Sequence, residues 1–256
     1  MSTTISFDVS EAVARITFAS PNGINILSTS LFGELLRRLD DVAADPEVRV
    51  LVLTGDGKTF LAGADIGEMS GAALSAGAEF SRRGRRVMDR IAGLESAVTI
   101  AAINGGAFGG GCELAVACDF RVMSESAKIG LTETRLGLVP GWGGMQRVMA
   151  LVGPSRARRM VFTGEPLDAG LAADIGLVNE VVAPDRLVQA TRRLSDEILA
   201  NGPLAVRLAK RCLIAAEQGT ESASLMEAVA FGEVFRSEQG REGLKAFIEK
   251  RRPVWS

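Results

Sequence analysis

The sequence predicts an α/β protein whose strands pair in parallel. Short β-branched apolar runs alternate along the chain with longer stretches whose apolar residues recur at helical spacing. A strand, a helix and a further strand in succession favour a parallel sheet with helical crossovers. The 256 residues, of which 47% are hydrophobic, suffice for one large domain or for a main domain with a small second one.

Strands and helices alternate through the first hundred residues. Val13–Phe18 is a predicted strand, which the turn Ser20–Gly23 ends. A helix follows from about Ser28, because apolar side chains share one of its faces while charged ones lie elsewhere. That face consists of Leu31, Leu35, Leu39 and Val42. The next predicted elements are the buried strand Val48–Thr54, the basic helix Gly84–Glu95 and the strand Ala97–Ile103.

The last quarter of the chain carries only helical patterns. Pro184–Ala200 is one predicted helix, and a second carries Leu204, Leu208, Cys212 and Ala215 on one face. Ser222–Phe235 and Arg241–Lys250 complete the helical tail. Helices this short leave apolar faces uncovered unless they pack on something else. We therefore expect an oligomer.

The composition excludes several classes of protein. The formal net charge of −2 argues against a generally basic nucleic-acid binder, and no apolar run is long enough to span a membrane. The N-terminal sequence does not resemble a signal peptide, and the three cysteines make neither a disulfide framework nor a metal quartet. We expect a cytoplasmic protein. Histidine and tyrosine are both absent, so acid–base chemistry falls mainly to Asp, Glu, Lys or Cys.

The most informative stretch runs from Asn104 to Glu113, out of an apolar strand and into a helix-like run. The consecutive glycines 109–111 let the backbone turn sharply and approach a ligand closely. The first N–H groups of a helix point at whatever lies in front of it, and Glu113 follows within one turn. Backbone donors beside a carboxylate suit a reaction in which negative charge develops on an oxygen while a proton moves.

Two further elements carry glycines: Thr59–Met69, which follows a predicted strand, and Leu131–Gly144. Taken alone, each glycine-containing element is explained at least as well by tight packing or a loop as by a ligand site. Together and in this order, the motifs resemble the crotonase superfamily, most closely its enoyl-CoA hydratase branch. The matching segments are Ala62–Ile66, Ala101–Gly105, Gly109–Ala115, Cys118-Asp119, Glu133, Leu136-Gly137, Pro140–Gly144, Gln146-Arg147, Thr163-Gly164, Gly176–Val178, Arg241–Phe247 and Glu249–Arg251.

The resemblance implies a crotonase-like spiral of ββα turns over residues 1–200, followed by a helical trimerisation region over residues 201–256. It implies a homotrimer or a dimer of trimers, an acyl-CoA thioester substrate, and no metal or cofactor, since CoA is part of the substrate. The N–H groups of Ala64 and Gly110 are implied to bind the thioester oxygen, and Glu113 and Glu133 to be the catalytic glutamates. The residues implied to run beside the CoA are Ala62, Gly63, Asp65, Ile66 and Gly67.

Hydration fits these residues chemically. Adding water across a double bond conjugated to a thioester passes through an enolate-like species, whose oxygen two N–H donors stabilise. One carboxylate takes a proton from water while an acid gives one to the α-carbon, and two nearby buried glutamates can hold different protonation states. Without catalysis, Glu113 would be only a helix N-terminal carboxylate and Glu133 a solvated loop residue. We predict an enoyl-CoA hydratase, a lyase of fatty acid metabolism. The alternatives are a Δ3-Δ2-enoyl-CoA isomerase, another crotonase-type acyl-CoA lyase, or a non-catalytic CoA- or RNA-binding homologue.

Two features depart from the family pattern. Trp142 occupies a position that is often small, and its ring is expected to reshape the acyl pocket. The segment Ser20–Asn25 lacks the basic residue that many relatives place near CoA. Lys58, or Lys250 and Arg251 of a neighbouring subunit, are therefore candidates to contact the CoA phosphates.

The basic cluster Arg82–Arg86 supports two interpretations. It suits an anionic ligand such as CoA or RNA, but a run of charges is usually a solvated helix face. The acidic net charge and the two glutamates favour the second interpretation. A salt-sensitive shift of labelled RNA in a binding assay would revive the first.

Overall fold

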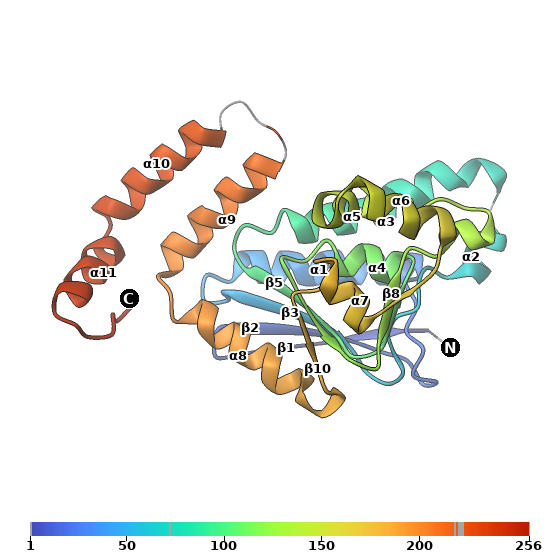
Figure 1. The fold of residues 1–256 in the computed structure, drawn as a ribbon, viewed down its shortest axis with the longest axis horizontal. Coiled ribbons are helices and arrows are strands. Elements are labelled where there is room, and N and C mark those ends of the chain that lie inside the picture. Colours follow the sequence, from blue (N-terminus) through green and yellow to red (C-terminus); the bar gives the residue numbers. More distant parts are fainter. Residues whose placement is uncertain (1, 72, 218, 220–222, 256) are drawn as a thin grey trace.

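Two sheets form the centre of the molecule, as the alternation of strands and helices predicted (Figure 1). The structure is a computed structural model that describes residues 2–71, 73–217, 219 and 223–255. In the larger sheet every neighbouring pair is parallel except β1 with β2, and in the smaller sheet only β8 and β9 are antiparallel. The larger sheet has, in spatial order, β1 (Thr4–Ser10), β2 (Val13–Ala19), β3 (Val50–Gly55), β5 (Val98–Ile103), β7 (Phe120–Ser124) and β10 (Glu180–Val182), and the smaller has β4 (Thr59–Leu61), β6 (Gly106–Phe108), β8 (Lys128–Gly130) and β9 (Leu167–Asp168).

The chain winds through the two sheets as a spiral. Each turn places one strand in the larger sheet and the next in the smaller sheet, as β3 and β4, β5 and β6, and β7 and β8 do, before a helical segment follows. This arrangement confirms the predicted ββα spiral. The helices are α1 (Thr29–Ala44), α2 (Ile66–Ser70), α3 (Gly77–Ala92), α4 (Gly110–Ala115), α5 (Gly144–Val152), α6 (Pro154–Thr163), α7 (Ala169–Asp174), α8 (Leu187–Leu199), α9 (Pro203–Glu217), α10 (Ala223–Arg236) and α11 (Glu238–Ile248), with 3-10 turns at Leu74–Ala76, Glu133–Leu136 and Pro184–Arg186.

Helices cover both faces of the larger sheet, which explains its uninterrupted apolar strands. Along β3, Leu51 and Leu53 pack into the main core with α1 and α3, whereas Val50 and Val52 face the opposite way, toward α8. The predicted apolar face of α1 is buried in the main core. The Ser28 side chain caps that helix by accepting a hydrogen bond from the Leu31 N–H.

The helical tail predicted from the sequence is present and leaves the sheets (Figure 1). The α8 helix ends at Leu199 and α9 begins at Pro203, whereas the predicted start of the next helix, Ser222, lies outside the described residues. No described helix is long and apolar enough to cross a membrane. Large apolar side chains of the tail stand 60–84% exposed, namely Leu225, Val229, Phe231, Phe235, Phe247 and Ile248.

Several elements differ from the sequence prediction. The basic helix begins at Gly77 rather than Gly84 and ends at Ala92. The strands β1, β7 and β10 of the larger sheet and the short strands of the smaller sheet were not predicted. Strands of two or three residues are too short to show a periodic pattern, so only their place in the spiral reveals them.

Candidate active site

Three loops far apart in the sequence meet at one edge of the smaller sheet. Strands β4, β6 and β8 are parallel neighbours, and their chain directions agree, so their carboxyl ends lie side by side. The loop Ala62–Asp65 follows β4, Gly109 follows β6, and Thr132 with Glu133 follows β8 shortly afterwards. The edge where parallel strands end is where α/β proteins usually bind ligands.

A cavity of about 650 Å³ lies between these loops, α2 and α3. It is lined by eight of the ten residues predicted to form the site: Ala62, Gly63, Ala64, Ile66, Gly110, Glu113, Glu133 and Trp142. Asp65 and Gly67 are not among the described residues that line it. The Asp65 carboxylate instead caps α2 by accepting a hydrogen bond from the Glu68 N–H, at 3.1 Å.

The two predicted oxyanion donors occupy local structures that leave their N–H groups available. The N–H of Leu27 donates a hydrogen bond to Gly63 O at 2.8 Å, and Leu27 O accepts one from the Asp65 N–H at 3.0 Å. Both bonds therefore involve the residues on either side of Ala64. Gly110 is the first residue of α4, so its N–H has no partner within the helix. The preceding Gly109 has φ +52°, a left-handed conformation that favours glycine.

Glu113 is buried on α4 and is held by a backbone loop. Its Oε1 accepts hydrogen bonds from the N–H groups of Trp142, at 2.8 Å, and Gly144, at 2.9 Å. Burial raises the pKa of Glu113, while these two N–H donors, followed by the charges of Arg147 and Arg85, act to lower it. The hydrogen bonds therefore favour the ionised form and oppose the rise in pKa that burial causes.

Glu133 is the first residue of the 3-10 turn after β8, and its carboxyl group has fewer hydrogen-bond donors around it than that of Glu113. Its Oε2 is buried and has no hydrogen-bond partner among the described residues. Burial, and next the negative charge of Glu113, raises the pKa of Glu133 to about 7. The two glutamates therefore differ: Glu113 has donors that favour its charge, and Glu133 is the better holder of a proton at neutral pH.

Aromatic side chains close one side of the cavity. The ring of the 3%-exposed Trp142 lies over Gly110 and Gly84 so closely that a Cβ at either glycine would overlap it. Trp142 also meets Phe32 edge-on, with centroids 5.2 Å apart, and Phe80 at 5.7 Å. Trp142 therefore forms part of the cavity wall, and its effect on the acyl pocket stays a prediction.

Several residues of the cavity wall were not predicted from the sequence. Phe80 belongs to the part of α3 that precedes its predicted start, although it lies four residues before Gly84 on the buried face of that helix. Glu68 also lines the cavity, and its Oε2 accepts hydrogen bonds from the N–H and the hydroxyl of Thr29. The helical spacing of Phe80 is a signal that could have found it, whereas only the fold brings Thr29 to Glu68.

The basic residues singled out from the sequence are mostly paired within the chain. Arg82 and Arg83 both bond Glu79, and Arg85 bonds Asp89. Arg83 and its partner Glu79 lie on the wall of the cavity, whereas the pairing of Arg82 and Arg85 favours a solvated helix face over an anion-binding surface. Arg251 bonds Glu242 and Glu249, which leaves its guanidinium less available to a CoA phosphate.

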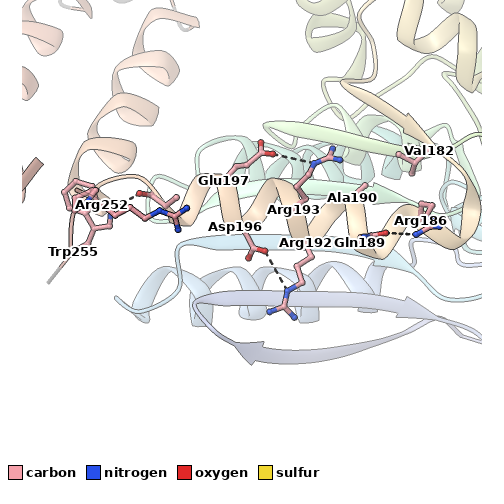
Figure 2. Close-up of a pocket in the computed structure, with 12 residues that line it drawn as sticks. Val182, Arg186, Gln189, Ala190, Arg192, Arg193, Asp196, Glu197, Arg252 and Trp255 are labelled. Carbon is pink, nitrogen blue, oxygen red and sulfur yellow. Dashed lines mark hydrogen bonds and ion pairs between the residues drawn. The ribbon is translucent and has the colours of Figure 1, made fainter. Parts of the chain in front are cut away.

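A larger groove of about 1090 Å³ lies on the far side of the molecule, between α8 and residues 252–255 (Figure 2). Its charged side chains pair with one another along α8, Arg192 with Asp196 and Arg193 with Glu197 (Figure 2). Trp255 closes one end and donates a hydrogen bond to Ala200 O at 2.9 Å. None of the predicted site residues lines this groove.

The ββα spiral, with Glu113 and Glu133 beside the glycine turn 109–111, is the arrangement that the resemblance to the crotonase superfamily implied. The chain matches the family described as "Enoyl-CoA hydratase/isomerase" over residues 8–256. It is 40% identical over 242 residues to a short-chain-enoyl-CoA hydratase of Clostridium acetobutylicum, covering 94% of this chain and 92% of the relative. It is also 40% identical over 253 residues to a crotonyl-CoA hydratase of Syntrophomonas wolfei, covering 97% and 96%.

Solved structures give the same result. A crystal structure of an enoyl-CoA hydratase from Bacillus anthracis superposes with a TM-score of 0.93 at 39% identity, covering 98% of each chain. The protein therefore belongs to the enoyl-CoA hydratase/isomerase family of enzymes.

Proposed function

We propose that the protein is an enoyl-CoA hydratase in which Glu113 is the base and Glu133 the acid. The observation that carries this proposal is the unequal support of the two buried glutamates. Two backbone N–H groups bond Glu113, whereas Glu133 has a buried oxygen without a described partner and a pKa raised to about 7. The addition of water requires a base and an acid that face one cavity, and the two donors on Glu113 favour the ionised form that a base needs.

The proposed reaction adds the two parts of water to the two carbons of the double bond. Glu113 takes a proton from water as the water oxygen bonds to the β-carbon. The electron pair of the double bond moves toward the thioester oxygen, and Glu133 donates its proton to the α-carbon. The product is a 3-hydroxyacyl-CoA, and the proton now on Glu113 returns to Glu133 through solvent. Dehydration is the same sequence in reverse.

The oxyanion donors act on the intermediate charge. As the double bond breaks, negative charge develops on the thioester oxygen, and N–H groups already aimed at that oxygen need no reorganisation. Ala64 and Gly110 are the proposed donors because both line the cavity and both have local structures that leave their N–H groups available. Removing one donor of this kind lowers a rate by about 100-fold or more.

The test is a panel of 2-enoyl-CoA thioesters mixed with the pure protein. Loss of the absorbance of the conjugated thioester reports hydration, and chromatography identifies the 3-hydroxyacyl-CoA product. A matched set of 3-enoyl-CoA thioesters tests the isomerase alternative, since isomerisation creates that absorbance. Formation of the conjugated thioester without any hydration would overturn the proposal.

We also propose that the helical tail assembles the protein as a trimer or a dimer of trimers. Phe231 and Phe247 stand 71% and 84% exposed, and apolar faces of this size in water favour association. Light scattering is expected to report a mass that is a multiple of three protomers. A monomer at the concentrations used for the assay would contradict this expectation.

A further inference from the structure

The loop Gly141–Gly144 determines where the Glu113 carboxylate points. Its two N–H donors, on Trp142 and Gly144, converge on a single oxygen of Glu113. They can do so because Gly143 between them has φ +93°, which turns the successive peptides toward the same point. Any movement of this turn would therefore move the carboxylate as well.

Arg147 lies across this turn, on the first part of α5. Its Nη1 donates a hydrogen bond to Trp142 O at 3.2 Å, and the same nitrogen would be 2.6 Å from a Cβ at Gly143. The arginine thus fills the space that a side chain at position 143 would take. Its side chain is only 20% exposed, so water competes weakly for these contacts.

The other end of the guanidinium is tied to α3. Nη2 of Arg147 donates to Asp89 Oδ1 at 2.6 Å, and Asp89 is also bonded by Arg85 at 3.3 Å. The same helix holds the start of the loop, because the Ser81 hydroxyl donates to Gly141 O at 2.7 Å. Helix α3 therefore braces the loop at both ends, directly through Ser81 and indirectly through Arg147.

We propose that Arg147 is a positioning residue for the base of the reaction. The planar fork of its guanidinium group donates hydrogen bonds to both the Trp142 carbonyl and the Asp89 carboxylate. These bonds fix the turn, and so keep the N–H groups of Trp142 and Gly144 aimed at Glu113. The arginine itself touches no reacting atom. This inference rests on the proposed role of Glu113 and deepens it, because it names what holds that carboxylate in its reactive orientation.

The charge of Arg147 adds an electrostatic effect that can be measured separately. The charged or titratable groups that act on Glu113 are Arg147 from α5, Arg85 from α3, Glu133 from the 3-10 turn and Cys112 beside it on α4. The two arginines lower the pKa of Glu113. Removing the charge of Arg147 therefore raises that pKa, so that activity falls at a higher pH on the acidic side of the profile.

The experiment compares Arg147→Met and Arg147→Lys with the parent enzyme. The Met variant is expected to lower kcat by about tenfold or more, because small misplacements of a catalytic group have large effects. It should leave KM for an enoyl-CoA thioester within about twofold and move the acidic limb to higher pH. The Lys variant keeps the charge but not the fork, so its kcat falls while its acidic limb stays near that of the parent.

A matched control is Arg90→Met, which removes another Arg–Asp pair of α3, that of Arg90 with Asp40 at 3.0 Å. This variant should keep the parent kcat and pH profile. Circular dichroism and titration with a saturated acyl-CoA check that each variant is folded and binds. If Arg147→Met does not fold, the Lys variant carries the test alone.

The outcomes separate this inference from the proposed function. If the parent enzyme hydrates enoyl-CoA and a folded Arg147 variant keeps the parent kcat and acidic limb, Arg147 has only a structural role and the inference is wrong. A Lys variant with the full parent kcat would show that charge alone suffices and would overturn the role of the fork. If the parent enzyme hydrates no thioester, the proposed function itself fails.

Discussion

The cavity beside the smaller sheet and the groove along α8 differ in how their charged side chains are paired and buried, which their volumes do not show. The groove is the larger, at about 1090 Å³ against about 650 Å³. Its arginines and carboxylates pair with one another at the surface, where Arg192 and Arg193 keep 65% and 58% of their side chains exposed. In the cavity, the buried Glu113 and the partly buried Glu133 lie among mostly apolar side chains, and Glu133 has a pKa raised to about 7.

This difference indicates which kind of pocket can support acid–base chemistry. Solvated charges that neutralise each other resemble ordinary protein surface, and each pair contributes little to stability. Buried carboxylates that are not neutralised respond strongly to their surroundings and can exchange protons near neutral pH. The comparison can be tested by making the same kind of substitution in both places.

The largest expected effect comes from the two glutamates of the cavity. Glu113→Gln and Glu133→Gln should each lower the hydration rate by about 100-fold or more, because each removes an acid–base catalyst. Binding of a saturated acyl-CoA should change little. Glu125→Gln, at an exposed position after β7, is the control and should keep the parent rate. A Gln variant of either cavity residue with near-parent activity would refute its catalytic role.

The next effect concerns stability: a substitution that lowers the hydration rate is expected to increase the stability of the fold. The folded pKa of Glu133, about 7, lies above the ordinary 4.5, so this carboxyl contributes full stability below pH 4.5 and loses it as the pH rises through 7. Glu133→Gln cannot ionise and should therefore be more stable than the parent at pH 8, by at most about 3 kcal/mol. Urea unfolding at pH 8 and pH 4 measures this, and the gain should vanish at pH 4.

A smaller effect is expected at the tryptophan of the cavity. Trp142→Leu opens space toward Phe32 and Phe80, so the ratio of kcat/KM for a six-carbon over a four-carbon enoyl thioester should rise. Each additional buried methylene contributes about 0.8 kcal/mol, or about fourfold. Trp255→Leu, in the groove, is the control and should leave this ratio unchanged. An unchanged ratio in the Trp142 variant would mean that the acyl chain does not reach this wall.

The smallest effect is expected in the groove. Arg193→Gln removes an exposed cation that pairs with Glu180 and Glu197. Such pairs contribute less than about 1 kcal/mol, so the free energy of unfolding should fall only slightly and hydration should be unaffected. A tenfold loss of hydration would show that the groove takes part in the reaction and would break the comparison.

Much of the site could be predicted from the sequence because it depends on backbone. Glycines at 63, 109 and 110 and the glutamates at 113 and 133 stand in motifs that can be found along the chain, and the predicted family was confirmed. The strands β3 and β5 were predicted because continuous apolar runs indicate strands that are buried on both faces. The buried strand β7 was not predicted, because Arg121 and Ser124 interrupt its apolar run. Roles that depend on a ligand, such as those of Ala64 and Gly110, stay predictions.

By itself, the sequence determined the alternation of strands and helices, the helical tail and the presence of two glutamates among glycine turns. The tertiary structure alone decided how these glutamates differ. The pKa of Glu133 depends on burial and on the charge of Glu113, and the orientation of Glu113 depends on a loop that Arg147 ties to α3. Apart from the bond of Arg147 to Trp142, five positions away, these interactions join residues 20 to 58 positions apart, and no local pattern records them. Backbone preferences are local and can be found in the sequence, whereas electrostatics depends on the folded neighbourhood.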